Sequence, residues 1–332
     1  MSGGTGGRIA GLDLLRGLAI GLVLLRHAAP GLAPGAGVVG VVMFFALSGY
    51  LITGLLVDEL DRTGRVDLRR FYLRRARRLV PALLVLLAAF ATITLALDPL
   101  DDRDQLLKTV VVALSWTGNL PFGHASDATF HLWTLATEEQ FYLVWPALLL
   151  FLGPRRGLLV AAAGTTALLL GTALWLRAVP DNAYSLPTPW TVCFVIGAAA
   201  RLHGARAYVP RWAAPAALAG LAVLSVIPLR GHALTYLAGG PAIATLTAVL
   251  AVAWRTWTEV TSPLLRAMAW LGTVSYGAYL WNYPLTLWLR PHLDHAGLLA
   301  AALTIGAAAA SWYAVERRFV GRSAPTREPA PA

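Results

Sequence analysis

The sequence predicts an all-α integral membrane protein with about ten transmembrane helices. Of its 332 residues, 57% are hydrophobic and only 13% are charged. Apolar runs of about 20 residues, the length that crosses a bilayer as a helix, recur along the whole chain. Ten such helices with short loops use nearly all of the length, so we expect one membrane domain over residues 1–320. The remaining residues, 321–332, are rich in proline, alanine and charge and are expected to be a disordered tail.

The predicted spans follow one another without an intervening soluble domain. They are residues 9–29, 38–57, 79–97, 132–152, 157–178, 189–203, 212–229, 233–253, 269–289 and 297–315. Asp13 and Arg16 interrupt the apolar core of the first segment, which favours a retained span over a signal peptide. Residues 98–131 are too short to cross the bilayer and return, so we expect an external loop with an interfacial or re-entrant helix there.

The basic residues orient these spans. Cytoplasmic loops of membrane proteins collect Lys and Arg. With the N-terminus inside, the ten spans place 20 basic residues on the cytoplasmic side and five on the outer side. We therefore expect a multi-pass protein of the cell membrane with both termini cytoplasmic. The same asymmetry accounts for most of the net charge of +10, so we expect membrane lipids and no nucleic acid as partners.

Two ionisable residues lie inside the first span. Such groups are costly in hydrocarbon and usually face a cavity or a partner, so Arg16 and His27 are candidate functional residues. Their spacing of 11 residues is about three helical turns, which puts both side chains on one helix face about 16 Å apart. His27 can act as a general base near neutral pH. A structural interpretation fits as well, in which Asp13 pairs with Arg16 and His27 is an interfacial residue.

A basic run precedes the third span. Arg74, Arg77 and Arg78 recur at helical spacing, so that, together with the adjacent Arg75, several guanidinium groups can converge on phosphates. Topology alone also favours arginines in a cytoplasmic loop. Eight arginines between residues 62 and 78 exceed what orientation requires, which favours phosphate binding.

Two further spans carry candidate residues. In the second, Ser48 and Gly49 permit the close approach of another helix, and a ligand tail can use the same gap. In the fourth, Glu138 and Glu139 are adjacent and point in different directions, so at least one faces a partner or water. We select Glu138, which shares a helix face with Tyr142 one turn further on.

The histidine and cysteine content indicates neither a metal site nor a disulfide. His292 and His295 have a metal-like spacing, but no carboxylate cluster accompanies them, so we expect no metal. The single cysteine, Cys193, lies in an apolar run and can form no intrachain disulfide.

Taken together, five stretches resemble the acyltransferase 3 family of polytopic membrane acyltransferases, in the family's order. They are Arg16 followed after ten residues by His27, the Phe44–Ile52 run (FFALSGYLI), the basic segment Arg74–Pro81, the segment Trp133–Pro146 and the segment Ser275–Pro284. The resemblance extends to Glu316 and covers nearly the whole chain. The chain departs from the family at Asn282, where such proteins often have His, and at Arg318, where they often have Pro.

The resemblance implies transfer of an acyl group, most often acetyl, from acetyl-CoA or another acyl-CoA. The implied acceptor is a hydroxyl of a carbohydrate, a glycolipid or a small natural product, and the chain resembles the standalone form without a soluble hydrolase-like domain. The residues expected to hold the donor are the arginines of the basic run and the small serine: Arg74, Arg75, Arg77, Arg78 and Ser48.

We expect three residues to act on the reacting groups. His27 would deprotonate the acceptor, Glu138 would orient it or complete the proton path, and Arg16 would assist the donor. We expect His27 and Glu138 to lie toward the outer half of the membrane, away from the arginines. The alternative function is a proton-coupled secondary transporter or exporter, in which the intramembrane Arg, His and Glu relay protons or bind an anion.

Overall fold

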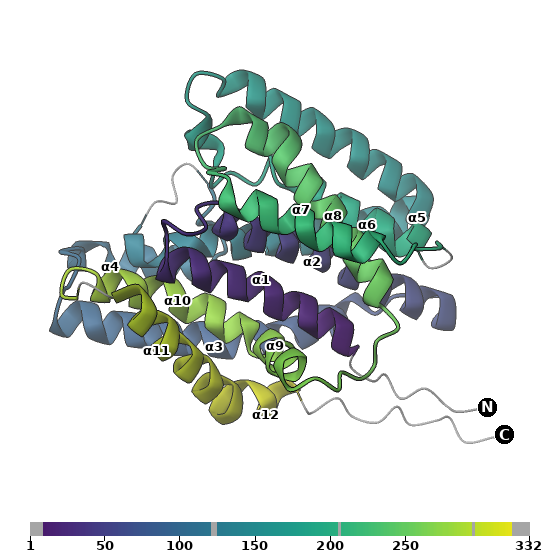
Figure 1. Cartoon of the computed structure of the whole chain (residues 1–332). Coiled ribbons are helices and arrows are strands. Elements are labelled where there is room, and N and C mark those ends of the chain that lie inside the picture. The colour runs from purple at the N-terminus through teal and green to yellow at the C-terminus, as the bar shows by residue number, and fades with distance from the viewer. Residues whose placement is uncertain (1–8, 121–124, 205–206, 294–295, 321–332) are drawn as a thin grey trace.

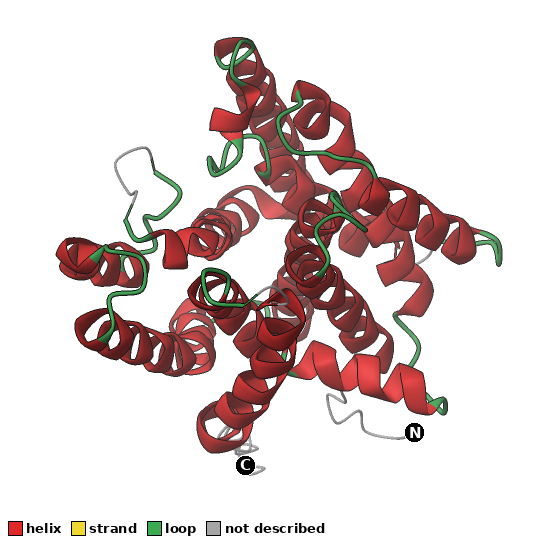
Figure 2. Cartoon of the chain, turned by 60° about the vertical axis from the view of Figure 1, so that its left-hand side comes forward, coloured by secondary structure: helices red, strands yellow, loops and turns green. Residues whose placement is uncertain are grey.

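The computed structural model describes residues 9–120, 125–204, 207–293 and 296–320, and every regular element within them is a helix (Figure 2). The described chain is therefore all-α, as predicted. Two central helices, α1 (Ala10–Ala28) and α2 (Ala36–Thr63), separate the others into two groups (Figure 1). The helices α5 to α8 lie on one side, and α3, α4 and α9 to α12 lie on the other.

The helix α2 is the most enclosed of the long apolar helices. Of its most apolar 18-residue window 78% is buried, against 22% to 50% in the other long helices. It crosses α6 (Thr191–Gly204) closely, because a Cβ added at Gly49 would lie 2.0 Å from the carbonyl oxygen of Phe194. A Cβ at Gly197 would in turn lie 1.9 Å from the carbonyl oxygen of Ala46. The close helix approach predicted at Gly49 is thus confirmed.

The helices α3 (Leu68–Ala96) and α5 (Trp133–Trp175) lie on opposite sides of the candidate site described below. At the start of α3, the Asp67 side chain accepts a hydrogen bond from the backbone N–H of Arg70. The α5 ribbon is interrupted at Gly153, whose φ of +76° and ψ of 164° are not helical and suit only glycine. This break separates the predicted fourth and fifth spans, as expected.

The segment between α3 and α5 folds back along α3. It contains η1 (Arg103–Gln105), α4 (Leu106–Leu114) and η2 (Asp127–Leu132). The 3-10 helix η2 packs mainly on α10, and both share buried clusters with α3: Ala128 with Trp288 and Phe90, and Leu132 with Leu280 and Leu83. The end of η2 therefore lies level with the middle of α3. The short helix expected in this segment is present as α4.

The predicted span 269–289 needs a correction, because it is two helices. The helix α9 (Pro263–Thr273) is followed by Val274, and α10 (Ser275–Leu289) begins directly after that residue. The turn between them lets both helices pack on α1: Gly272 of α9 lies against the carbonyl of Asp13, and Ser275 of α10 contacts Arg16.

The remaining helices correspond to predicted spans. They are α7 (Ala213–Val226), η4 (Thr235–Gly239) continuing into α8 (Gly240–Trp254), and α11 (Ala296–Ser311) continuing through η5 (Trp312–Glu316) into α12 (Arg317–Val320).

Large apolar side chains cover the outside of several helices. Four leucines have about half or more of their surface exposed: Leu84 on α3, Leu159 and Leu174 on α5, and Leu298 on α11. Within the described residues, five helical segments are long and apolar enough to cross a membrane, and shorter apolar helices accompany them. The protein is therefore a polytopic membrane protein. Ten spans and cytoplasmic termini stay predictions, and the predicted tail, 321–332, lies outside the described residues.

Candidate active site

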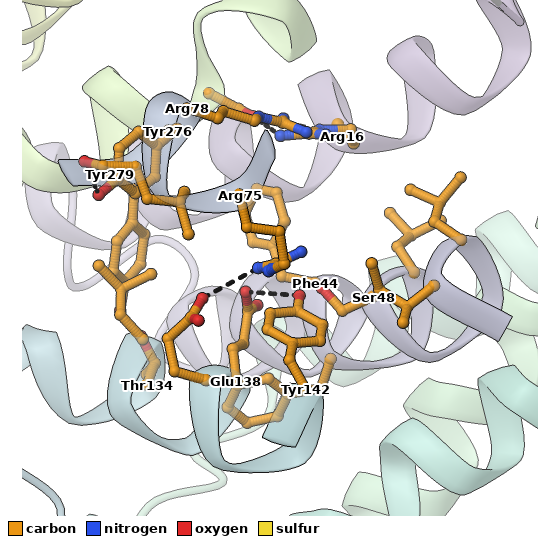
Figure 3. Close-up of a pocket in the computed structure, with 18 of the residues that line it drawn as sticks. Arg16, Phe44, Ser48, Arg75, Arg78, Thr134, Glu138, Tyr142, Tyr276 and Tyr279 are labelled. Atoms are coloured by element: carbon orange, nitrogen blue, oxygen red, sulfur yellow. Dashed lines mark hydrogen bonds and ion pairs between the residues drawn. The ribbon is translucent and has the colours of Figure 1, made fainter. Parts of the chain in front are cut away.

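A cavity of about 240 Å³ lies between α2, α3, α5 and α10. Its α2 wall is apolar except for one hydroxyl, that of Ser48, whereas α1, α3, α5 and α10 contribute polar side chains (Figure 3). The polar lining residues are Arg16, Ser48, Arg74, Arg75, Arg78, Thr134, Glu138, Glu139, Tyr142, Ser275, Tyr276 and Tyr279. The structure thus brings together six of the eight site residues predicted from the sequence.

One side of the cavity is a network centred on Arg75. Its Nη2 donates to Glu139 Oε1 at 2.9 Å, and its guanidinium carbon lies 3.4 Å from the ring centroid of Tyr142. The Tyr142 hydroxyl donates to Glu138 Oε2 at 3.1 Å (Figure 3). Arg75 therefore neutralises one glutamate directly and reaches the other through a tyrosine.

Two further arginines, Arg16 and Arg78, lie on another wall of the cavity. Figure 3 shows the side chains of Arg16, from α1, and Arg78, from α3, close together. The Nη2 of Arg16 also donates to Ser275 Oγ at 3.1 Å. Two neighbouring cations repel each other, and an anionic or strongly polar ligand between them would offset that repulsion.

The basic run contributes three of its four predicted arginines to the lining. Residues 74, 75 and 78 fall within about 100° of one another around α3, whereas residue 77 lies about 60° outside that arc. Accordingly Arg77 is exposed and is not among the lining residues. Arg74 lines the cavity, and its nearest carboxylate oxygen, on Glu59, is 3.8 Å away.

The predicted separation of Glu138 from the arginines is wrong. Glu138 and Glu139 line the same cavity as Arg75, and Glu139 is in contact with it. The cause is the fold-back of η2 described above. Because α5 begins beside the middle of α3, its second turn faces the first turns of α3, where the arginines lie.

His27 lies in a different cluster, outside the lining of the cavity. Its Nδ1 is hydrogen-bonded to Asn282 Oδ1 on α10. Its ring meets that of Tyr283 edge-on, with 5.4 Å between the centroids. We call His27, Asn282, His131 and Tyr283 the histidine cluster, since the His131 ring also lies 5.4 Å from that of Tyr283.

His131 connects the two groups, although its sequence context gave no sign of this. Its ring is buried, with Nε2 at 3.2 Å from the Leu280 carbonyl and no hydrogen-bond partner for Nδ1 among the described residues. Its backbone carbonyl accepts a hydrogen bond from the hydroxyl of Tyr279, which in turn accepts one from Thr134. Tyr279 and Thr134 both line the cavity. His131 therefore borders both the cavity and the histidine cluster. The sequence around His131 predicts a loop, so no helix face could be assigned to this residue.

No group of three or more His, Cys, Asp or Glu suited to a metal ion gathers in the part of the chain that the structure describes. His295 of the metal-like pair lies outside that part.

Comparison with known proteins identifies the family of the chain. A family model described as an acyltransferase domain, Acyl_transf_3, matches residues 9–316. O-acetyltransferase OatA of Staphylococcus aureus strain NCTC 8325 is 40% identical over 153 residues, which are 43% of this chain and 25% of OatA. OatA of strain MRSA252 gives the same values. The chain thus spans about a quarter of the length of these relatives, and no solved structure matches it. Because the family model covers nearly the whole chain, this protein belongs to the acyltransferase 3 family of membrane acyltransferases.

Proposed function

We propose that this protein is an O-acyltransferase that moves an acetyl group from acetyl-CoA, or another acyl group from an acyl-CoA, to a hydroxyl. The acceptor would be a carbohydrate, a glycolipid or a small natural product on the outer side of the membrane. The family and the printed name of the OatA relatives support acyl transfer. The observation that carries the donor assignment is a cavity with arginines on one wall and an apolar wall opposite.

The lining of the cavity suits the two ends of an acyl-CoA. Coenzyme A carries phosphates at one end and a thioester on a long, flexible arm at the other. Arg74 and Arg78 offer guanidinium groups for the phosphates, and Phe44, Leu47 and Leu51 of α2 offer apolar surface for the arm. Pockets that enclose a drug-sized ligand measure about 300–1,000 Å³. A cavity of about 240 Å³ therefore suits the arm and its thioester, with the nucleotide outside, near the exposed start of α3.

The proposed reaction is a direct transfer. The acceptor oxygen forms a bond to the thioester carbonyl carbon while its proton passes to His27. The C–S bond then breaks, and the coenzyme A thiolate leaves and takes up that proton from His27, which restores the neutral base. The carbonyl oxygen becomes negative as the new bond forms, and Arg16 would stabilise that charge.

The acyl carbonyl is placed at the Thr134 and Tyr279 end of the cavity in this proposal. That end borders His131 and, through it, the histidine cluster. Glu138, held by Tyr142, would orient the reacting groups or complete the proton path. A proton-coupled transporter uses the same residue types, but the family of the chain favours the transferase.

The test is coenzyme A release by detergent-purified protein supplied with acetyl-CoA and a panel of envelope sugars. His27→Ala should lower kcat by at least about 100-fold while acetyl-CoA binding persists. An Arg74→Ala/Arg78→Ala double variant should raise the KM for acetyl-CoA. Arg211→Ala is the control, because Arg211 is exposed between α6 and α7 and does not line the cavity.

Two results would overturn the proposal. Full turnover by His27→Ala would remove the histidine from the reaction. Failure of the folded wild-type protein to bind any acyl-CoA would remove the donor, and substrate transport into proteoliposomes would then be measured.

A further inference from the structure

A buried asparagine occupies one side of the His27 ring. Asn282 is 1% exposed, lies on α10, and its Oδ1 is hydrogen-bonded to Nδ1 of His27. This is the position at which the sequence departs from the histidine often found in the family. A buried amide in an apolar helix is costly unless both its oxygen and its nitrogen have partners. The partner of its nitrogen is therefore informative.

That partner fixes which way the amide points. Asn282 Nδ2 lies 3.4 Å from Thr304 Oγ1 on α11, and the Thr304 hydroxyl donates its own hydrogen to the Ala300 carbonyl at 2.6 Å. With its hydrogen engaged, the Thr304 oxygen can only accept. It therefore faces the amide NH₂, and the amide oxygen faces His27.

The direction of the amide determines the tautomer of the histidine. An amide oxygen only accepts hydrogen bonds, so Nδ1 of His27 must carry a hydrogen and donate it. In the neutral imidazole the lone pair is then on Nε2. The ring of Tyr283 packs edge-on against the imidazole at an interplanar angle of 63°.

We propose that Asn282, itself oriented by Thr304, is a positioning residue that keeps His27 in the Nδ1–H tautomer, so that Nε2 accepts the proton of the acceptor hydroxyl. The proposal rests on the proposed function, because it takes His27 as the base. It adds which atom of that base reacts and which residues select it. The proton moves from the acceptor oxygen to Nε2, while Nδ1–H stays bonded to Asn282.

The first readout is kinetic. Asn282→Leu has a similar size but no acceptor, and should lower kcat by at least about 10-fold with the KM for acetyl-CoA within twofold of wild type. Asn282→Asp restores an acceptor oxygen and should recover most of the lost kcat. Thr304→Val leaves Asn282 in place but frees its amide to turn, and should lower kcat less than Asn282→Leu does.

The matched control for Thr304→Val is Thr247→Val. Thr247 is also fully buried and also donates to the carbonyl four residues earlier, that of Ile243 at 2.8 Å, but it lies on α8. The Thr247→Val variant should leave kcat unchanged. A loss of activity in Thr304→Val alone then reflects the contact with Asn282 rather than the loss of a buried hydroxyl.

The second readout does not depend on activity. Protein labelled with ¹⁵N in its histidines reports which imidazole nitrogen carries the hydrogen, and the signals of His27 are assigned by their loss in His27→Gln. Wild type should show a protonated Nδ1 and an unprotonated Nε2 for His27. Asn282→Leu should show the other tautomer or a mixture.

The outcomes separate the two proposals. A lower kcat together with a changed tautomer supports the inference. An unchanged tautomer in Asn282→Leu, or a changed tautomer with full kcat, overturns it. Wild-type protein that shows the Nδ1–H tautomer but transfers no acyl group overturns the proposed function, and with it the catalytic part of the inference, while the contact itself is confirmed.

Discussion

The guanidinium carbon of Arg75 lies over the ring of Tyr142, 3.4 Å from its centroid, while its Nη2 donates a hydrogen bond to Glu139. This contact joins α3 to α5 across the cavity. The guanidinium group of Arg75 is thereby engaged by residues of α5. In this respect Arg75 differs from Arg74 and Arg78. Arg75 is suited to holding the walls of the site together, whereas Arg74 and Arg78 are suited to ligand phosphates.

Removing Arg75 should therefore destabilise the fold more than it weakens donor binding. Arg75→Ala leaves Glu139 without its partner in a partly buried site, and breaking such a pair costs about 3 kcal/mol. Thermal unfolding in detergent should show a clearly lower Tm, with Arg211→Ala unchanged. A Tm equal to that of wild type, with weaker acetyl-CoA binding, would instead make Arg75 a donor ligand.

Removing Arg78 from its place beside Arg16 should have the opposite effect, because it should weaken donor binding more than it destabilises the fold. Arg78→Gln removes a cation that a bound anion would offset, and a charge-assisted hydrogen bond contributes about 1.5–3 kcal/mol, so the Kd for acetyl-CoA should rise at least about 10-fold. Loss of the repulsion from Arg16 should leave the Tm unchanged or raise it. Isothermal titration calorimetry at two salt concentrations measures the Kd for acetyl-CoA. The Kd of the variant should depend less on salt than that of wild type. Unchanged donor affinity would place the phosphates elsewhere.

Glu138 should act on turnover rather than on donor affinity. Glu138→Gln keeps an oxygen that accepts from Tyr142 but removes the negative charge. We expect kcat to fall by about 10-fold or more while the KM for acetyl-CoA stays within twofold. Tyr142→Phe, which loses only the hydroxyl contact, is the companion variant and should lower kcat less. A Glu138→Gln protein with normal kcat would leave Glu138 a purely structural residue.

The crossing of α2 and α6 should tolerate no added methyl group. Gly49→Ala would place a Cβ 2.0 Å from a backbone oxygen, which cannot move aside as a flexible side chain can, so we expect a loss of about 2 kcal/mol or more. Gly306→Ala is the control, because that helical glycine has no atom within 4 Å of an added Cβ and the substitution favours helix. Size-exclusion profiles and Tm values report the result. Equal stability of the two variants would contradict the close crossing.

Features within one helix could be predicted from the sequence. The spacing of Arg16 and His27 predicts one helix face, and both side chains contact α10, at Ser275 and Asn282. The pair Ser48 and Gly49 predicted either close packing or a ligand gap, and the structure has Gly49 in the first role and Ser48 on the cavity. Helical periodicity is sufficient for such predictions.

Features between helices could not be predicted in this way. The pairing of Arg75 with Glu139 depends on the register of α3 against α5, which is set by where η2 lies along α10. Arg77 was included because its spacing alone does not say which arc of α3 faces inward. His131 was missed because its position depends on the same segment.

The contact between Tyr279 and His131 has a consequence for the durability of the site. Tyr279, at the end of the cavity, donates to the main-chain carbonyl of residue 131 and not to its side chain. Every amino acid supplies that carbonyl, so substitutions at this position can leave the hydrogen bond of Tyr279 in place. The side chain of residue 131 can therefore change on the side of the histidine cluster while the end of the donor cavity keeps its shape.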